Sequence, residues 1–264
     1  MRAFLANYFH NTKKPIPINE LQNYVRTDSV AKLFEKVAGG PVGHMSDREI
    51  HMLRQKVHEM LAWSHQDTVF VKNHNQIAFV DGVPTINPEA TAGAIYIIRN
   101  PLDVCVSYAH HYGIDLDSAV VALRSRDTRT TTQGEHVLQY MGTWSDHVLS
   151  WTTVPGMRLQ IVRYEDLVRN PLEIYRRLIE FLGIPEELPR LNRAIRFSDF
   201  RELSKQEIKG GFVEANEKRS FFRRGKVGDW RSTLSSEQAR AIISNHRQVM
   251  TRFGYLNKDG EPIF

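Results

Sequence analysis

Short apolar runs alternate along this chain with longer stretches in which apolar residues recur every three or four positions. The runs at 68–72 (TVFVK), 94–98 (AIYII) and 158–162 (RLQIV) have the length and β-branched content of strands. The run at 94–98 is apolar throughout, which predicts a strand buried on both faces. This alternation of strands and amphipathic helices predicts an α/β fold, with a mostly parallel central sheet covered by helices on both faces.

The expected helices carry clear signals at their ends. The sequences SDRE at 46–49 and SSEQ at 235–238 are capping boxes, each followed by apolar residues at helical spacing. A further apolar stripe over 172–182 is closed by a glycine. Residues 1–9 also have helical spacing, although no capping residue precedes them. Because no repeat or linker interrupts the pattern, we expect one domain over residues 1–264.

Composition excludes several classes of protein. Of the 264 residues, 41% are hydrophobic and 25% are charged, which is typical of a soluble globular chain and not of a disordered or collagen-like one. The apolar runs are much shorter than the roughly 18 residues that a membrane-spanning helix needs. The N-terminus lacks the pattern of a signal peptide. The single cysteine, Cys105, excludes an internal disulfide and favours a reducing compartment, so we expect a cytoplasmic protein.

The positive charge is concentrated in one part of the chain. The formal net charge is +5, from 35 basic and 30 acidic residues. Residues 193–231 contain 11 of the basic and 6 of the acidic residues, a net of +5, and the remainder holds 24 of each. A local patch of this kind suits a compact polyanion such as a nucleotide. A solvated basic loop would give the same pattern, and charge alone does not decide between them.

The window 94–112 places an arginine where an α/β fold binds anions. Arg99 directly follows the expected strand, and Pro101 stands at a favoured first position of a helix. The C-terminal edge of a sheet and the N-terminus of a helix both favour an anion, and Ser107, further along the helix, has a hydroxyl to offer. Alternatively, Arg99 pairs with Asp103 and Ser107 is a small packing residue.

The window 69–75 (VFVKNHN) contains a candidate catalytic pair. Lys72 and His74 alternate, so on a strand that continues that far both point to one face. Such a pair stabilises a transferring anionic group and removes a proton. The chain has 11 histidines, however, and most histidines in proteins are at the surface or structural.

Two later windows complete the candidate site. Arg223 and Arg224 precede Gly225, so two guanidinium forks stand next to an approachable backbone amide, which suits a phosphate. An exposed basic turn is the alternative. In the window 163–171, Tyr164 can stack on or hydrogen-bond a base, while the two acidic residues that follow it can cap the next turn. The chain contains no Walker motif, no GxGxxG, no HExxH or cysteine pair for a metal, and no GxSxG.

Together these windows resemble the sulfotransferases that use 3′-phosphoadenosine-5′-phosphosulfate (PAPS), the family of the cytosolic enzymes. The matching segments are VKNH at 71–74, IIRNPLDVCVSY at 97–108, YEDLVRNP at 164–171 and RRGKVGDW at 223–230. They correspond to the family's K-T-H, its arginine–serine segment, its Y-E-D-x-x-x-x-P and its R-K-G-x-x-G-D-W. Their order and number make the resemblance specific, and it extends over nearly the whole chain.

The resemblance implies roles for the nucleotide-binding residues. The family's 3′-phosphate contacts correspond here to Arg99, Ser107, Arg223, Arg224 and Gly225. Tyr164 corresponds to an adenine contact. Ser198 and Phe200, in RFSDFREL, look like the family's T-S-F segment, which implies that Phe200 stacks on the base. PAPS is then the donor substrate and the nucleotide product is 3′-phosphoadenosine-5′-phosphate (PAP).

The resemblance also implies how the reaction proceeds. His74 corresponds to the general base that deprotonates an acceptor hydroxyl or amine, and Lys72 to the residue that stabilises charge on the sulfuryl group. Asn73 replaces the family's threonine between them, and we expect little consequence from this change. The acceptor is a small molecule, a glycan or a peptide, and we expect no nucleic acid, membrane or metal as a partner. The oligomeric state is left open.

One part of the family pattern is missing. The family begins with a strand and a Y-P-K-S-G-x-T-W loop that binds the 5′-phosphosulfate, whereas residues 1–5 here look like the helix after that loop. We therefore expect the P-loop-NTPase-like sulfotransferase fold without its first strand, and impaired transfer by the chain as it stands. The alternative is an inactive nucleotide-binding or scaffolding remnant that binds PAP without transfer. Nucleic-acid binding through the basic stretch is a third hypothesis, and it predicts affinity that falls steeply with salt.

Overall fold

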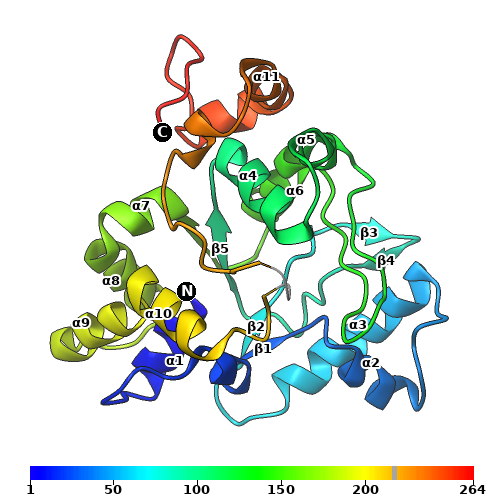
Figure 1. Ribbon diagram of the computed structural model, residues 1–264. Helices are drawn as coiled ribbons and strands as arrows, with labels where there is room; N and C mark the ends of the chain where they lie inside the picture. Colours follow the sequence, from blue (N-terminus) through cyan, green and yellow to red (C-terminus); the bar gives the residue numbers. More distant parts are fainter. Residues whose placement is uncertain (216–218) are drawn as a thin grey trace. The chain divides into compact units, whose positions relative to one another are not determined.

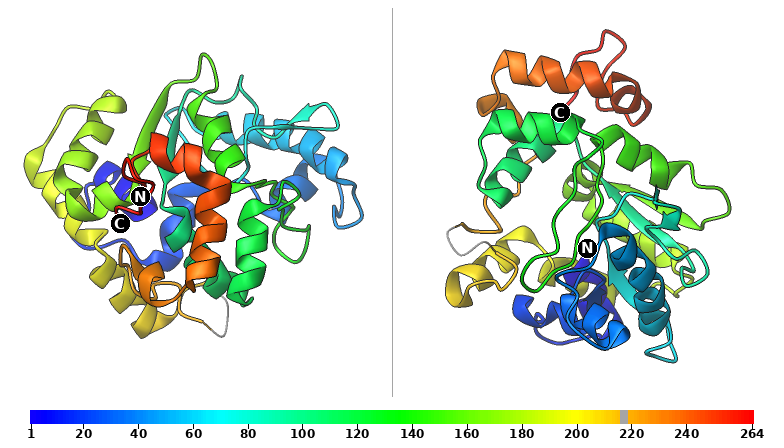
Figure 2. Two further views of the ribbon diagram at one scale, coloured as in Figure 1. Left: turned by 90° about the horizontal axis from the view of Figure 1, so that it is seen from above. Right: turned by 90° about the vertical axis from the view of Figure 1, so that its right-hand side faces the viewer.

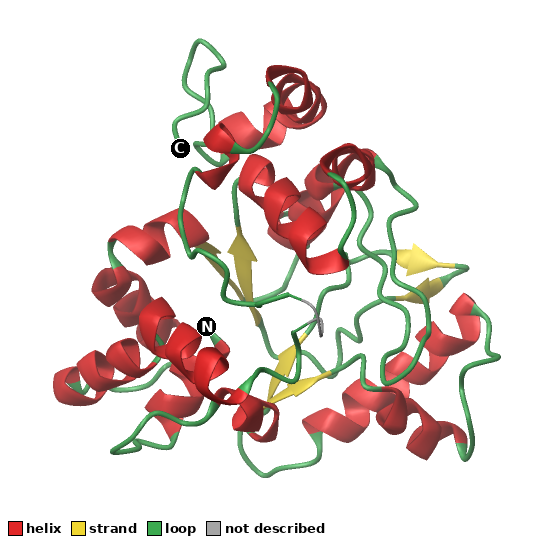
Figure 3. Cartoon of the chain, viewed as in Figure 1, coloured by secondary structure: helices red, strands yellow, loops and turns green. Residues whose placement is uncertain are grey.

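Helices make up about half of the structure, and the strands between them are short (Figures 1 and 3). The computed structural model describes residues 1–215 and 219–264, and within these residues the strands form three two-stranded ladders. They are β1 (Val25–Thr27) with β2 (Phe70–Lys72), β3 (Phe79–Val80) with β4 (Val83–Pro84), and β5 (Ala94–Ile98) with β6 (Leu159–Arg163). β5 and β6 run parallel, whereas β3 and β4 form an antiparallel hairpin. The expected α/β class is confirmed.

The three predicted strands are present, but the burial expected for one of them is wrong. β5 occupies residues 94–98, as predicted, and β2 and β6 lie within one or two residues of their predicted limits. Ile98 is buried, yet Ile97 is 42% exposed and Ile161 on β6 is 37% exposed. In the described part of the chain β5 pairs only with β6, and the exposure of its side chains depends on the elements packed across each face, which the apolar run does not specify.

The chain divides into two compact units, each described by itself. The first consists of Met1–Val25, Tyr96–Val120 and Gln160–Phe264, and the second of Arg26–Ile95 and Val121–Leu159. The expectation of a single domain over residues 1–264 stays a prediction. The helices of the first unit are α1 (Arg2–Phe9), α4 (Pro101–Tyr112), α7 (Tyr164–Arg169), α8 (Pro171–Phe181), α9 (Leu188–Phe197), α10 (Phe200–Gly210) and α11 (Ser236–Arg252), with 3-10 turns η1 (Ile18–Asn23) and η2 (Asp229–Ser232). Those of the second are α2 (Ala31–Ala38), α3 (Asp47–Ala62) and α6 (Trp144–Thr152), and α5 (Leu116–Arg124) has residues in both.

The first unit is held together by aromatic and aliphatic packing around α1, which contacts α9 (Figure 2). Phe4 on α1 stacks on Tyr175 of α8 with 3.7 Å between ring centroids, and both rings are buried. Another face of α1 joins a cluster with Ile16, Ile18 and other apolar side chains before β1. The helical pattern seen at residues 1–9 is therefore confirmed, and its apolar side chains form core contacts.

The second unit has its core between α2 and α3. Phe34, Ile50 and Val57 are fully buried there and form one cluster with Leu61 and Val137. The capping box predicted at residues 46–49 is present at the start of α3, and the one predicted at 235–238 is present at the start of α11 in the other unit. Each satisfies two backbone amides that a helix N-terminus leaves without partners.

Candidate functional site

Arg99 lies in the turn between β5 and α4, and its guanidinium is held by three neighbours. Its carbon Cζ lies 4.5 Å from the centroid of the Tyr164 ring, and its Nη2 donates to the carbonyl oxygen of Lys226 at 3.3 Å. Asp103 is also close, with 3.8 Å between Nη2 and Oδ2. The pairing with Asp103 that the sequence left open is therefore present, together with contacts to two of the other predicted segments.

The turn itself is fixed by a buried carboxylate. Glu165 is fully buried and accepts from the backbone amide of Asn100 at 2.9 Å and from the Tyr255 hydroxyl at 3.1 Å. Burial raises the pKa of Glu165, and the hydrogen bond from Asn100 offsets part of this effect. The sequence suggested a turn cap for Glu165. The structure shows instead that it joins α7 to the residue that follows Arg99.

The predicted arginine loop is organised around one acidic residue. Arg224 Nη1 lies 2.6 Å from Asp229 Oδ1, and Arg223 pairs with the other carboxylate oxygen. Burial by itself would raise the pKa of Asp229, but the hydrogen bonds and charges of the two arginines hold it below its usual value. One carboxylate therefore spaces the two guanidiniums that the sequence assigns to a phosphate.

A second carboxylate attaches this loop to α4. Asp103 is buried, and its two oxygens accept from the backbone amides of Gly228 at 2.8 Å and Trp230 at 3.1 Å. In the same loop, Gly225 has φ +60°, and a Cβ built there would lie 2.4 Å from the ring of Phe200. The structure therefore brings Phe200 against Gly225, while the nucleotide roles of both residues stay predictions.

Within the described residues, neither Ser107 nor Ser198 makes a side-chain hydrogen bond to the other predicted nucleotide residues. Ser107 is exposed on α4. Ser198 ends α9, and its hydroxyl donates to the carbonyl of Ala194 at 2.9 Å and lies 3.1 Å from that of Ile195. That hydroxyl is occupied by its own helix, so its nucleotide role stays a prediction.

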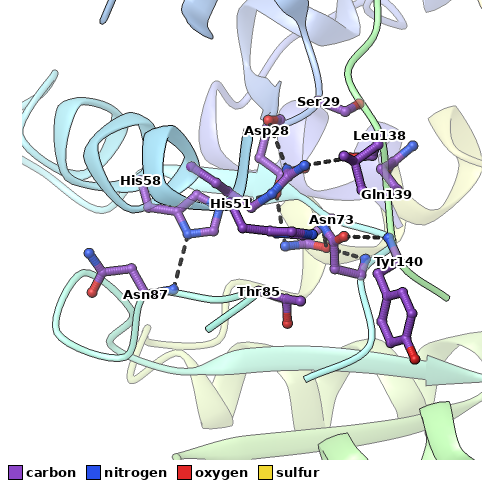
Figure 4. A network of polar contacts seen from close by, with 12 residues as sticks. Asp28, Ser29, His51, His58, Asn73, Thr85, Asn87, Leu138, Gln139 and Tyr140 are labelled. Carbon is purple, nitrogen blue, oxygen red and sulfur yellow. Dashed lines mark hydrogen bonds and ion pairs between the residues drawn. The ribbon is translucent and has the colours of Figure 1, made fainter. Parts of the chain in front are cut away.

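Lys72 and His74 belong to the second unit, whereas the predicted nucleotide contacts belong to the first. β2 ends at Lys72, so the strand alternation invoked to place both side chains on one face does not extend to His74. His74 is exposed, and its carbonyl oxygen lies 3.2 Å from His147 Nε2. Burial lowers the pKa of His147. Lys72 is thus the last residue of the strand and His74 lies in the turn after it, and polar contacts of this turn are drawn in Figure 4.

A hollow of about 380 Å³ lies in the same unit, and the first residue of its lining, Gln76, stands two positions after His74 in the sequence. Its walls are mostly polar, and they include an ion pair between Arg126 and Asp146. The other lining residues are Tyr140, Gly142, Leu149, Ser150 and Thr153. In the part of the chain that the structure describes, no group of His, Cys, Asp and Glu is arranged to hold a metal, and no helix is long and apolar enough to span a membrane.

Three of the buried acids in these sites make contacts that sequence reasoning did not assign to them, beside the pairing of Asp103 with Arg99 that it did consider. Asp103, Glu165 and Asp229 each stand inside a motif that was recognised, but their partners lie 65 to 127 residues away or on the opposite side of a turn. Their place inside recognised motifs is the one sequence signal that pointed to these acids. Burial, which sets them apart from other acids, cannot be seen at a single position of a sequence.

Comparison with known proteins shows which family this chain resembles. A model of the family described as "Sulfotransferase domain" matches residues 38–254. "Cytosolic sulfotransferase 13" of Arabidopsis thaliana is 29% identical over 182 residues, which are 65% of this chain and 55% of that protein. "Flavonol 4'-sulfotransferase" of Flaveria chlorifolia is 27% identical over 161 residues, 56% of this chain and 49% of that protein. The chain thus spans about half the length of these curated relatives.

The fold is similar to that of solved structures. Retinol dehydratase, solved with androsterone and the inactive cofactor PAP, superposes with a TM-score of 0.62 at 15% identity, over 94% of this chain and 76% of that one. This likeness confirms the expected sulfotransferase fold. Because the family model matches more than half of the residues, this chain belongs to the sulfotransferase-domain family.

Proposed function

We propose that this chain binds the 3′-phosphate and adenine of PAPS and takes part in sulfuryl transfer to a hydroxyl or amine. Membership of the family supports sulfuryl transfer in general. The observation that supports the finer proposal is the continuous set of contacts from Tyr164 through Arg99 to the loop at residues 223–230. These segments are far apart in sequence, and each was predicted to contact the same nucleotide.

The residues of the first unit suit a nucleotide with a terminal phosphate. Guanidinium groups bind phosphate through parallel hydrogen bonds, and Arg99, Arg223 and Arg224 provide three of them. Gly225 has no side chain to block an approach to its amide. The Tyr164 and Phe200 rings offer flat apolar surfaces for a base. The residues of this unit therefore suit the 3′-phosphate and the adenine of the nucleotide.

The chemistry assigned to the second unit is a nucleophilic displacement at sulfur. The His74 imidazole takes the proton from the acceptor hydroxyl or amine as the acceptor atom forms its bond to sulfur. The bond between sulfur and the bridging oxygen breaks, and the electron pair leaves with PAP. The Lys72 ammonium stabilises negative charge on the sulfuryl oxygens.

For the acceptor we propose the hollow that Gln76 lines, two positions after His74. Its volume of about 380 Å³ is within the usual range of small-molecule sites. The name of the Flaveria relative indicates a flavonol acceptor, which supports a small-molecule acceptor here over a glycan or peptide. Tyr140→Ala is expected to raise the KM for the acceptor more than the Kd for PAP, because Tyr140 lines the hollow and is not among the residues that we assign to the nucleotide.

The test is calorimetric titration with PAP and with AMP, which lacks the 3′-phosphate. We expect PAP to bind at least about tenfold more tightly, and Arg99→Ala to remove most of that difference, since each charge-assisted contact contributes about 1.5–3 kcal/mol. Arg177→Ala is the matched control, because Arg177 is an exposed arginine of α8 whose partner is Glu173. Equal binding of PAP and AMP would overturn the proposal. Binding of PAP without transfer from labelled PAPS would instead favour the inactive remnant.

A further expectation concerns where the protein is located in the cell. The lone cysteine, which is buried and free, is compatible with a cytoplasmic location, and that location stays a prediction. Activity of the chain by itself is measured separately from PAP binding.

A further inference from the structure

A buried polar network contacts the segment 72–74, which contains the candidate catalytic pair (Figure 4). Asp28, which follows β1, is fully buried, and one of its oxygens, Oδ2, is shared by three nitrogen atoms. These are Arg54 Nη1 at 3.1 Å, His58 Nε2 at 3.0 Å and Asn73 Nδ2 at 2.9 Å. The backbone amide of Asp28 also donates to the carbonyl of Lys72 at 3.2 Å. One residue therefore contacts two consecutive residues of the segment 72–74.

The carboxylate is fixed from behind by groups that cannot easily move. Arg54 is fully buried and also donates to the carbonyl of Leu138, so its guanidinium is held at two ends. The backbone amide of Asn87 donates to His58 Nδ1 at 3.2 Å, and we infer from this that Nε2 carries the ring hydrogen and donates it to Asp28. Both neighbours thus present donors to the carboxylate from α3.

Asn73 transmits this fixed position to the next residues. Its side-chain Nδ2 donates to Asp28, while its side-chain Oδ1 accepts from the backbone amide of Asn75 and from Asn75 Nδ2 at 3.1 Å. Asn75 is buried and has further contacts, since its Oδ1 accepts from the amide of Tyr140 at 2.8 Å and its carbonyl accepts from Trp151 Nε1 at 3.0 Å. The backbone is thereby fastened on both sides of the exposed His74.

We propose that Asp28 is a positioning residue for the segment 72–74 and that it acts through the side chain of Asn73. An asparagine suits this task because its amide has a donor and an acceptor that point in different directions. A threonine at the same place has a single hydroxyl closer to the backbone. We expected the asparagine in place of the family's threonine to matter little. On this proposal its side chain has a specific partner, the buried Asp28.

The charge state of Asp28 agrees with this role. Burial by itself would raise its pKa, but the hydrogen bond from His58 and the charge of Arg54 outweigh burial and hold the pKa below its usual value. The carboxylate is therefore ionised at neutral pH, when a hydrogen bond from Asn73 is charge-assisted.

The catalytic meaning of this arrangement rests on the proposed function, whereas the positioning itself does not. The experiment therefore uses one measurement without ligand and one with it. The first is amide hydrogen exchange of residues 73–75 in the full chain, followed by NMR, together with the spectrum of the His74 ring. The second is kcat for transfer from PAPS, compared with the Kd for PAP.

Asn73→Ala is the principal variant, because it removes the bridge without leaving a buried charge unpaired. A hydrogen bond to a charged group commonly changes an equilibrium constant about tenfold to a hundredfold, so exchange of the Asn75 amide should be at least about tenfold faster. The His74 ring signals should shift or broaden. Asn73→Thr should give an intermediate exchange rate, because the hydroxyl can replace one of the lost contacts. In an active enzyme kcat should fall by about the same factor while PAP affinity stays unchanged.

Asn87→Ala is the matched control. Asn87 is a buried asparagine of the same unit, and none of the hydrogen bonds that the structure gives its side chain within the described residues reaches His58, Asp28 or residues 72–75. Its backbone amide, which donates to His58, is kept in the variant. Exchange that is unchanged in Asn73→Ala, or equally fast in Asn87→Ala, would overturn the positioning role. Asp28→Asn should reproduce the effect of Asn73→Ala if it folds. A wild-type chain that neither binds PAP nor transfers sulfuryl would refute the proposed function, and the exchange result would still decide the positioning role.

Discussion

Asp103→Asn should release the loop at residues 223–230 from α4. The wild-type carboxylate is buried and accepts from two backbone amides, those of Gly228 and Trp230, with one oxygen for each. Asparagine has nearly the same shape, but one of its two terminal groups is an NH2. That group would face a backbone N–H, so one of the two amides loses its acceptor and the other keeps only a neutral one.

The expected magnitude follows from these two bonds. Hydrogen bonds to charged groups contribute about 1.5–3 kcal/mol each, and a buried donor without a partner costs about 1–3 kcal/mol. Losing one bond and weakening the other should lower the free energy of unfolding by about 2–4 kcal/mol. For a chain of this size that corresponds to a Tm lower by roughly 4–16 °C. The Kd for PAP should rise at least about tenfold, because the same loop carries Arg223 and Arg224.

Urea denaturation and calorimetric titration with PAP measure the two effects. Asp117→Asn is the control, since it removes the same charge from an exposed carboxylate that accepts from Gln238 at 2.7 Å and so joins α5 to α11. Exposed substitutions usually change stability by less than about 0.5 kcal/mol. If Asp103→Asn unfolds at the wild-type urea concentration, Asp103 does not hold the loop and the reasoning is wrong.

Three further outcomes are expected. Gly225→Ala should weaken PAP binding at least about tenfold, because the new Cβ would lie 2.4 Å from the Phe200 ring at a backbone φ of +60°, and wild-type affinity in titration would contradict this. Burial, with a smaller effect from a nearby arginine, lowers the pKa of His51 from 6.5 to about 4. Between these values the unfolded state binds more protons, so stability should decrease by roughly 3 kcal/mol as the pH falls, and urea titrations of His51→Phe should lack this slope. Burial also raises the pKa of the Cys105 thiol to about 12, so a thiol reagent should leave native Cys105 unmodified and react only after unfolding; rapid native labelling would show that the site opens.

The elements of this fold could be predicted where local chemistry determines them. The capping boxes that begin at Ser46 and Ser235 were read directly, because each involves residues three positions apart. The strand at 94–98 was also placed correctly, yet the exposure of Ile97 was not, because exposure depends on which elements lie across from a strand. Local sequence contains no information on that.

The candidate site shows the same division. The motifs assigned Arg99 and Tyr164 to the same nucleotide, and the structure brings these two side chains together at the ends of paired strands. The contact between Asp103 and Trp230 joins positions 127 residues apart, and no local pattern predicts it. Asn73 is the clearest case, because a difference from the family motif was visible but its buried partner, Asp28, could be found only in three dimensions.

The pairing of Arg223 and Arg224 with Asp229 has a consequence for selectivity. A ligand that approaches these guanidiniums meets a resident anion, so binding is an exchange of partners. A singly charged anion offers no more charge than the aspartate already supplies. A phosphate monoester carries about two negative charges at neutral pH and three acceptor oxygens, so it can engage the donors that the aspartate leaves open. If the loop binds a phosphate as proposed, it should discriminate between anions by how many charges they carry, and chloride or sulfate monoesters should compete poorly with a terminal phosphate.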